Sequence, residues 1–309
     1  MYNFNECAAQ AKNKLINVRD IIRFMVSSFQ EHNLSYGHGT NNPYDEAVYL
    51  TLATLHLPID QLEPYLDAKL LDYEIDNLLN VCKRRVEQRI PAPYITNEAN
   101  FQGYKFYVDS RVIIPRSYIA EIILNGRLDE YIEHTELVHN VLDLCTGNGS
   151  ISIIAADYFY DSNILASDVD QNALDVAKIN IEKYSLQDKI KLLRSNLFED
   201  IPMTSKFDLI LTNPPYVDMD KMNSLPVEYT HEPSISLFGG SDGLGLIELI
   251  ITQARHYLNE FGIIVLEMGD NKLELEEHFL GLDFKWLATE NNQGFVFVLT
   301  KKDLDNFFA

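Results

Sequence analysis

Beyond residue 137 the chain alternates short apolar segments with helical patterns, and this alternation restricts the fold more than any other feature. The apolar segments are VHNVLDL, NILASD, IKLLRS, FDLILT and GIIVLEM. Helical patterns follow Gly149 and span Asn172–Tyr184 and Leu244–Leu258. Such alternation predicts a mostly parallel sheet with helices on both faces. The last two apolar segments, FKWLAT and GFVFVL, predict an antiparallel edge, so we expect a doubly wound, Rossmann-like α/β fold.

The first ninety residues read as helices instead. Apolar residues three or four positions apart predict an amphipathic helix over Ala8–Gln30. We expect further helices over Tyr44–Leu55, Ile59–Leu66 and Tyr73–Arg89, the last ending ahead of Pro91. This part of the chain is therefore predicted to be a small helical domain.

Between these two parts, Tyr94–Ile114 is rich in aromatic residues and has Gly103 at a turn, which predicts a hairpin. A helix over Arg116–Glu133 is expected to follow. The predicted division of the chain is a helical domain, a linking β-hairpin and an α/β domain, over residues 1–93, 94–115 and 116–309.

Charge is unevenly distributed. Residues 1–95 carry 9 Lys and Arg against 12 Asp and Glu, and residues 96–309 carry 16 against 34, so net charges of −3 and −18 make up the total of −21. So acidic a protein is poorly suited to replace the counterions of DNA, which argues against DNA as the main partner. It attracts a basic partner, although acidity also serves solubility. One basic cluster, Lys83, Arg84, Arg85 and Arg89, favours a solvated helix face over an RNA contact.

The apolar runs and the cysteines of the sequence also bear on where the protein is located and on whether it binds a metal. No apolar run reaches the ~18 residues of a membrane-spanning helix, and the first residues lack a signal-peptide stretch. We therefore expect a cytoplasmic protein that does not bind membranes. The isolated cysteines, Cys7, Cys82 and Cys145, supply neither a disulfide framework nor a four-thiolate zinc site. No metal is expected.

In open α/β sheets ligands bind at the carboxyl ends of the strands, and two strand ends here indicate a nucleotide-like cofactor. The first strand ends at Asp143 and continues into a loop in which Gly147 and Gly149 allow close backbone approach before a helix start. The second strand ends at Asp168, 19 residues after Gly149 (168 − 149 = 19). That is close to the ~20-residue spacing at which an acidic side chain takes ribose hydroxyls.

The same residues favour S-adenosylmethionine over a dinucleotide. Ser152 stands where the dinucleotide pattern has glycine or alanine, and Asp143 would repel a pyrophosphate. The amino group of S-adenosylmethionine can face the Asp143 carboxylate, while its carboxylate faces the amides of the helix start. We therefore predict S-adenosylmethionine as the cofactor.

The fourth strand runs directly into Asn213-Pro214-Pro215-Tyr216. The two prolines stiffen this segment, so that the Asn213 carboxamide oxygen and the Pro214 carbonyl can accept both N–H bonds of one planar NH2 group. Tyr216 then serves as a flat wall. Binding both N–H bonds orients a weak nitrogen nucleophile toward the sulfonium methyl, so catalysis rests on orientation and electrostatics.

The combination of DLCTGNGS, NPPY and Ile113–Glu121 (IIPRSYIAE) resembles the HemK-like glutamine methyltransferases over nearly the whole chain. The resemblance implies a helical substrate-recognising domain attached to a class I methyltransferase sheet, which methylates the side-chain amide nitrogen of a protein glutamine. It implies that Asn213 to Tyr216 receive the glutamine. The resemblance also implies that Asn196 and Leu197 lie near the adenine of the cofactor, so the residues predicted to bind the cofactor are Asp143, Gly147, Asn148, Gly149, Asp168, Asn196, Leu197 and Asn213.

Two features distinguish the branches of this family. The release-factor branch usually has glycine where this chain has Cys145, whereas the branch that modifies the third protein of the large ribosomal subunit has cysteine. Leu225–Pro233 also looks like that second branch, with Leu-Pro, Glu-Tyr and His-Glu-Pro. Asn148 and Ser150 depart from the usual family residues, which bears on cofactor affinity rather than on the reaction. We favour the ribosomal-protein branch, with a basic ribosomal protein as substrate and the release-factor branch as alternative.

Two other functions are weighed against this one. Enzymes that methylate the exocyclic amine of adenine in DNA share the NPPY element but need a basic surface. A ribosome-assembly factor that binds without modifying has no reason to keep both Asn213 and Asp168. We interpret His231 and Glu232 as loop-ordering or substrate-contacting residues rather than metal ligands, and we assign Glu267 no base role.

Overall fold

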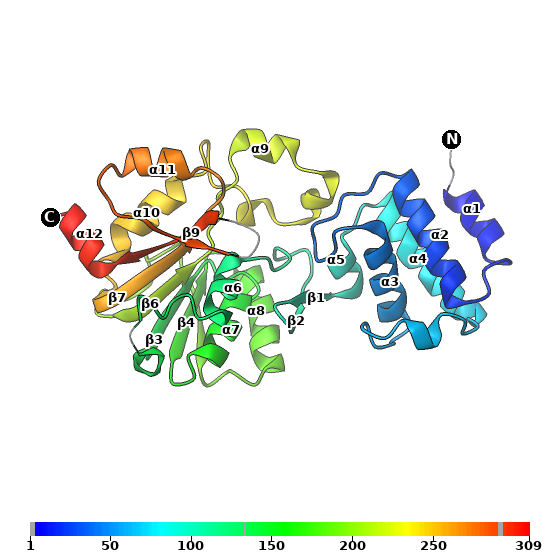
Figure 1. Ribbon diagram of the computed structural model, residues 1–309, viewed down its shortest axis with the longest axis horizontal. Coiled ribbons are helices and arrows are strands. Elements are labelled where there is room, and N and C mark those ends of the chain that lie inside the picture. The colour runs from blue at the N-terminus through cyan, green and yellow to red at the C-terminus, as the bar shows by residue number, and fades with distance from the viewer. Residues whose placement is uncertain (1–3, 133, 290–292) are drawn as a thin grey trace. The chain divides into compact units, whose positions relative to one another are not determined.

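A computed structural model describes residues 4–132, 134–289 and 293–309 of the chain (Figure 1). The chain forms two compact units. The helical unit contains residues 1–100 together with Pro226–His231, and the α/β unit contains Phe101–Leu225 together with Glu232–Ala309. No pattern in the sequence indicates that six residues beyond the NPPY element belong to the helical unit.

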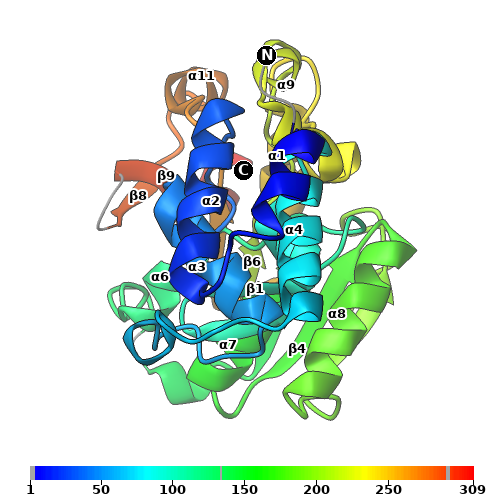
Figure 2. The same cartoon turned by 90° about the vertical axis from the view of Figure 1, so that its right-hand side faces the viewer.

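The helical unit packs α2 beside α3 and α4 around a core of apolar side chains (Figures 1 and 2). Its helices are α1 (Phe4–Ala11), α2 (Val18–Glu31), α3 (Pro43–Thr54), α4 (Asp72–Glu87) and α5 (Ala92–Thr96). The predicted helix over Ala8–Gln30 is wrong in its continuity: it is divided into α1 and α2, because the Asn17 side chain accepts the Asp20 amide and starts a new helix.

The helix predicted over Ile59–Leu66 is also wrong. Only a three-residue 3₁₀ turn, Glu63–Tyr65, forms there. Pro64 lies in the middle of that segment, and proline removes one backbone hydrogen bond and clashes with the preceding turn. The predicted helices over Tyr44–Leu55 and Tyr73–Arg89 are confirmed within two residues as α3 and α4.

A short β-hairpin links the helical segment to the rest of the chain. Its strands, β1 (Glu98–Phe101) and β2 (Tyr104–Tyr107), form a two-stranded sheet. The two turn residues, Gln102 and Gly103, have φ values of 50° and 82°. Positive φ at both positions is the geometry that suits a two-residue hairpin, which confirms the predicted turn at Gly103.

The α/β unit contains a seven-stranded sheet in the order β5-β4-β3-β6-β7-β9-β8. The strands are β3 (Asn140–Leu144), β4 (Asn163–Asp168), β5 (Ile190–Arg194), β6 (Phe207–Thr212), β7 (Leu258–Glu267), β8 (Lys285–Ala288) and β9 (Gln293–Thr300). Strands β3 to β7 run parallel, and β9 is antiparallel to both β7 and β8. The predicted doubly wound sheet with an antiparallel edge is confirmed, while the polar turn between β8 and β9 lies outside the described residues.

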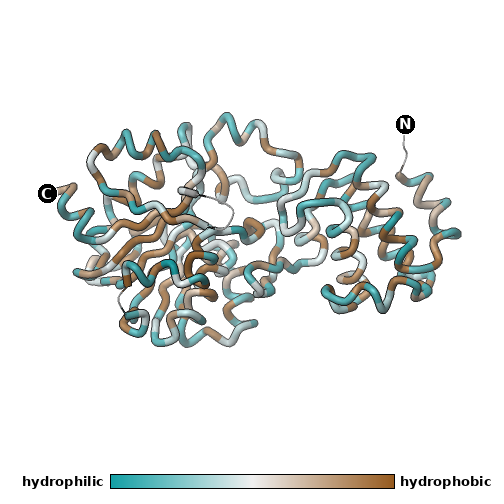
Figure 3. The backbone as a smooth tube through the Cα atoms, in the orientation of Figure 1, coloured by the Kyte–Doolittle hydropathy of each residue, from teal (hydrophilic) through white to brown (hydrophobic). Residues whose placement is uncertain are grey.

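Helices cover both faces of this sheet (Figure 1). The helices of the α/β unit are α6 (Tyr118–Leu124), α7 (Ser150–Tyr158), α8 (Gln171–Lys183), α9 (Met219–Ser224), α10 (Gly245–Ala254), α11 (Lys272–His278) and α12 (Lys301–Phe307). Val141 and Leu209 share one core cluster with α6 and α7, whereas Leu142 and Ile210 share another with α10. Successive strand residues point to opposite faces of the sheet, and helices cover both faces. The strands are therefore apolar along their length (Figure 3).

Helix α6 ends well before the Glu133 end that the sequence predicts. Gly126 adopts φ 64°, its amide donates to Ile123 O at 3.0 Å, and the Arg127 amide donates to Ile122 O at 3.0 Å. This pair of bonds is the Schellman motif, in which glycine ends a helix in a left-handed conformation.

Among the described residues, none of the helices has the length and apolar content that a membrane span requires.

Candidate active site

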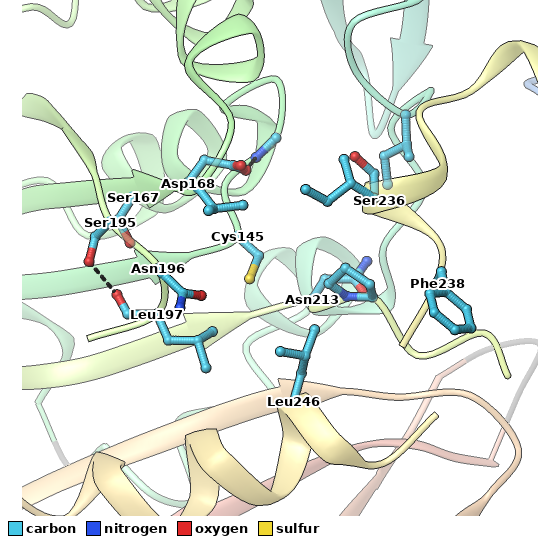
Figure 4. A pocket seen from close by; sticks show the side chains of 15 residues that line it. Cys145, Ser167, Asp168, Ser195, Asn196, Leu197, Asn213, Ser236, Phe238 and Leu246 are labelled. Atoms are coloured by element: carbon cyan, nitrogen blue, oxygen red, sulfur yellow. Dashed lines mark hydrogen bonds between the residues drawn. The ribbon is translucent and has the colours of Figure 1, made fainter. Parts of the chain in front are cut away.

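The carboxyl ends of β3, β4, β5 and β6 surround a cavity of about 240 Å³ in the α/β unit (Figure 4). The order of strands reverses between β3 and β6, and such a switch point is where ligands bind in open α/β sheets. The cavity is lined by Ile113, Cys145, Gly147, Ser167, Asp168, Val169, Ser195, Asn196, Leu197, Asn213, Pro215, Ile235, Ser236, Phe238 and Leu246.

Figure 4 shows two ends of this cavity. Asp168, Asn196 and Leu197 lie at one end, and Asn213 and Phe238 lie at the other. The Cys145 side chain lies between them. The first three are predicted cofactor residues, and Asn213 is the first residue of the segment predicted to receive an amide.

The loop after β3 has three residues in left-handed backbone conformations, two of them glycines. Cys145, Gly147 and Gly149 have φ values of 59°, 55° and 80°. A Cβ built on Gly147 would meet no atom within 4 Å, and since Gly147 lines the cavity, that side chain would occupy the space open to a ligand. A Cβ on Gly149 would lie 3.3 Å from that of Ala177, so this glycine allows the close packing of α7 on α8.

Asp143 lies beneath this loop and is not among the residues that line the cavity. One carboxylate oxygen accepts hydrogen bonds from Thr146 Oγ1 at 2.6 Å and Ser152 Oγ at 2.5 Å. The other oxygen is buried without a partner in the part of the chain that the structure describes. Burial raises the pKa of Asp143 to about 6, and the two hydroxyl donors oppose that shift. That Asp143 faces a cofactor amino group stays a prediction.

Asp168 lies at the end of β4 and does line the cavity. Its carboxylate accepts the Gly147 amide and the Asp170 amide, each at 2.9 Å, so it joins the two loops that border the cofactor end. Burial raises the pKa of Asp168 above the usual value of an aspartic acid. A carboxylate offers about four acceptor positions, so acceptor capacity remains for a hydroxyl group of a ligand.

The residues after β5 complete the cofactor end. Ser195 Oγ donates to Leu197 O at 2.8 Å and also accepts the Asp200 amide at 3.0 Å, which fixes the turn that presents Asn196 and Leu197. Ser195 lines the cavity but is not among the residues predicted from the sequence, although a hydroxyl directly after a strand is a visible signal. Asn148 and Gly149 do not line the cavity, and the Asn148 side chain instead caps the Ser150 amide at 3.1 Å.

Three glycines allow neighbouring segments to pack directly against the NPPY segment. A Cβ on Gly239 would lie 2.6 Å from Pro215 O, one on Gly243 would overlap Tyr216 O, and one on Gly269 would lie 3.0 Å from the Tyr216 ring. Only glycine permits such close approach at these positions. Asn213 and Pro215 line the cavity, whereas Pro214 and Tyr216 do not.

The basic cluster predicted to be a solvated helix face is used inside the helical unit. The buried Arg85 guanidinium lies 2.6 Å from the Glu46 carboxylate and 3.1 Å from that of Glu228, and Arg89 lies 3.0 Å from Glu228. The solvated interpretation is therefore wrong for Arg85, because two buried carboxylates require a paired cation. His231 Nε2 contacts Gln88 O at 2.9 Å, which is a loop-ordering contact.

The residues at the cavity fit S-adenosylmethionine. The Gly147 backbone leaves ligand space, Asp168 keeps acceptor capacity for ribose hydroxyls, and the unpartnered Asp143 oxygen beneath the loop suits a nearby cation. Among the described residues no group of three His, Cys, Asp or Glu side chains could hold a metal ion. Sheet order, antiparallel edge and strand-end site together define a class I S-adenosylmethionine-dependent methyltransferase.

Comparison with known proteins narrows this class. The methyltransferase small domain family matches residues 127–228. A ribosomal protein uL3 glutamine methyltransferase of Neisseria gonorrhoeae is 48% identical over 96% of this chain and 98% of its own length, and one of Burkholderia pseudomallei is 45% identical over 93% and 95%. The chain belongs to the ribosomal protein uL3 glutamine methyltransferase family, and its methyl donor is S-adenosylmethionine.

Among solved structures, the Thermus thermophilus 16S rRNA N2 G1207 methyltransferase in complex with AdoMet and guanosine is 19% identical, with a TM-score of 0.45 over 66% of this chain and 49% of that one.

Replacing Asp168 by Ala tests the cofactor end. We expect S-adenosylmethionine affinity to fall by about 1.5–3 kcal/mol, because charged hydrogen bonds to ribose hydroxyls are lost. Titration calorimetry measures this. The control is Asp175→Ala, an exposed position on α8, which should bind normally. Equal affinity of both variants and the parent would contradict the role of Asp168.

Glu267 gives a prediction about pH. It is buried at the end of β7, and its carboxylate accepts Ser117 Oγ at 2.6 Å and the Tyr118 amide at 2.8 Å. Burial raises the pKa of Glu267 from 4.5 to about 7, although these donors oppose the shift. The folded state therefore binds more protons between these values, and the contribution of Glu267 to the free energy of unfolding falls as pH rises through that window.

Glu267→Gln removes this titration. Relative to the parent, the free energy of unfolding of the variant should rise between about pH 5 and about pH 8, as followed by urea unfolding at several pH values. Glu260→Gln, at an exposed position of the same strand, is the control and should show no such trend. A difference between variant and parent that does not change with pH would show that Glu267 does not titrate in this window.

Proposed function

We propose that this protein transfers a methyl group from S-adenosylmethionine to the side-chain amide nitrogen of a glutamine in ribosomal protein uL3. The position of the Asn213 carboxamide carries the proposal: it lies on the same cavity as Asp168 and Asn196, at the opposite end (Figure 4). The uL3-specific names of its relatives support the choice of client. At that place the Asn213 side chain offers its amide oxygen as an acceptor for an N–H bond of a glutamine amide.

The substrate end also has an apolar wall. Phe238 lies at the Asn213 end of the cavity (Figure 4), Ile113 and Ile235 line the same cavity, and Ile235 and Phe238 are 53% and 37% exposed. A glutamine side chain has two methylene groups before its amide. Exposed apolar side chains beside a carboxamide suit such a stem, because they remove its apolar surface from water.

In this mechanism Asn213 Oδ1 and Pro214 O accept the two N–H bonds of the glutamine amide. The stiff Pro214-Pro215 backbone holds the acceptors still, so the nitrogen lone pair points toward the cofactor end of the cavity. Bound S-adenosylmethionine would supply the electrophilic methyl group and keep the electron pair of the broken carbon–sulfur bond, while the amide nitrogen held by Asn213 and Pro214 would lose one proton to solvent. The residues supply orientation and electrostatic stabilisation rather than a strong base.

The client is proposed to be a basic protein. The chain carries a net charge of −21, of which −18 lies in residues 96–309. That part contains 16 Lys and Arg and 34 Asp and Glu. Ribosomal proteins bind RNA phosphates through Lys and Arg, so their charge complements that of this chain.

Replacing Asn213 by Ala tests the mechanism. We expect single-turnover methylation of uL3 to slow by ~10²–10³-fold, because one oriented polar contact to the reacting group is lost. Cofactor affinity, measured by calorimetry, should fall far less than turnover. Asn223→Ala, at an exposed position of α9, is the matched control. An Asn213→Ala enzyme that keeps most of its turnover would rule out the amide-binding mechanism.

Salt dependence tests the proposed client. Because screening weakens attraction between opposite charges, association of uL3 with this protein should slow as ionic strength rises. Stopped-flow association rates at several salt concentrations measure the effect. If the rate does not change with salt, the acidity serves solubility alone.

A further inference from the structure

The turn that follows Ile113 is held by a buried carboxylate from a distant part of the chain. Glu232 Oε1 accepts the Ile114 amide at 2.9 Å and Arg116 Nη1 at 2.6 Å, while Oε2 accepts Arg116 Nη2 at 2.6 Å. The Glu232 side chain is fully buried. This bidentate pairing fixes both the distance and the plane of the guanidinium.

The Arg116 side chain also binds the backbone of its own turn. Its Nη1 also donates to Ile114 O at 3.1 Å, so side chain and backbone of the turn are tied together. On the far side, the Glu267 carboxylate holds the next residue through Ser117 Oγ. The Arg116 carbonyl is therefore fixed from both sides, and its direction depends on the Glu232 ion pair.

The Arg116 carbonyl faces the Asn213 carboxamide. Asn213 Nδ2 lies 3.5 Å from Arg116 O, at the long end of hydrogen-bond distance. A carboxamide has a donor end and an acceptor end, and a carbonyl oxygen beside it favours the donor end. With Nδ2 directed at Arg116 O, the other end, Oδ1, is left to accept a substrate N–H bond.

We propose that Glu232 and Arg116 are positioning residues that orient the Asn213 carboxamide, so that its oxygen rather than its nitrogen meets the glutamine amide. This rests on the proposed function and adds to it. With the carboxamide reversed, two donors would face each other at the substrate and two acceptors would face each other at Arg116. The ion pair thus acts on the reaction through one side chain that touches the substrate.

A buried ion pair also has a plain structural use, so the test must separate the two roles. In Glu232→Gln the charge is removed at nearly constant shape. We expect kcat for uL3 methylation to fall by on the order of 10²-fold, the cost of a misplaced group in a catalytic site. The KM for uL3 and the dissociation constant of S-adenosylmethionine should stay within a few-fold of the parent.

The double variant gives the decisive result. If Glu232 acts through Asn213, then Glu232→Gln added to Asn213→Ala should cause no further loss of turnover. Asp109→Asn is the matched control: Asp109 forms a bidentate pair with Arg111 in the preceding part of the chain, and its loss should leave kcat unchanged. Arg116→Lys, which keeps the charge and loses the fork, should resemble Glu232→Gln.

Other results would overturn the proposal. Parent-like kcat in both Glu232→Gln and Arg116→Lys would do so, as would losses that multiply in the double variant. Should Glu232→Gln fail to bind S-adenosylmethionine, the test rests on Arg116→Lys, alone and combined with Asn213→Ala. If Asn213→Ala itself keeps full turnover, the proposed function fails; if only the Glu232 and Arg116 variants are parent-like, the positioning role fails.

Discussion

The parallel register of β3, β4, β5 and β6 is the constraint on which the site depends. Leu144 pairs with Ser167 on one side and with Thr212 on the other, and Asp168 pairs with Arg194. The residues that follow these pairs therefore reach one edge of the sheet together. A carboxylate, a glycine turn and a carboxamide, which lie far apart in the sequence, share one cavity because the strands end in line.

Rigidity is the second requirement, since an amide nitrogen is a poor nucleophile and the chain supplies orientation instead of a base. Two prolines limit the backbone after Asn213, and Gly239, Gly243 and Gly269 allow neighbouring segments to pack directly against it. Backbone pairing adds to this: the Val217 amide donates to Leu237 O at 2.9 Å. The segment that presents the carboxamide is thus held by close packing rather than by its own hydrogen bonds alone.

Much of this arrangement is predictable from sequence, because it rests on local signals. Apolar strands, glycines that permit positive φ and the proline pair predict the sheet, and the strand-end rule brings Gly147, Asp168 and Asn213 to the cavity. The pairing of Arg116 with Glu232 is not predictable, since an ion pair between residues 116 positions apart leaves no periodic pattern (232 − 116 = 116). The same applies to the buried Glu228, whose partners Arg85 and Arg89 read as surface charge in a one-dimensional pattern.

The central claim is that one cavity joins a methyl donor to a glutamine amide of uL3. The most direct measurement is peptide mapping by mass spectrometry of uL3 incubated with this protein and S-adenosylmethionine. The account predicts a single added methyl group on the side-chain amide of one glutamine, and none when uL3 is incubated with the cofactor alone. A methyl group on lysine or arginine, or unmodified uL3 in the presence of a protein that binds the cofactor, would contradict it.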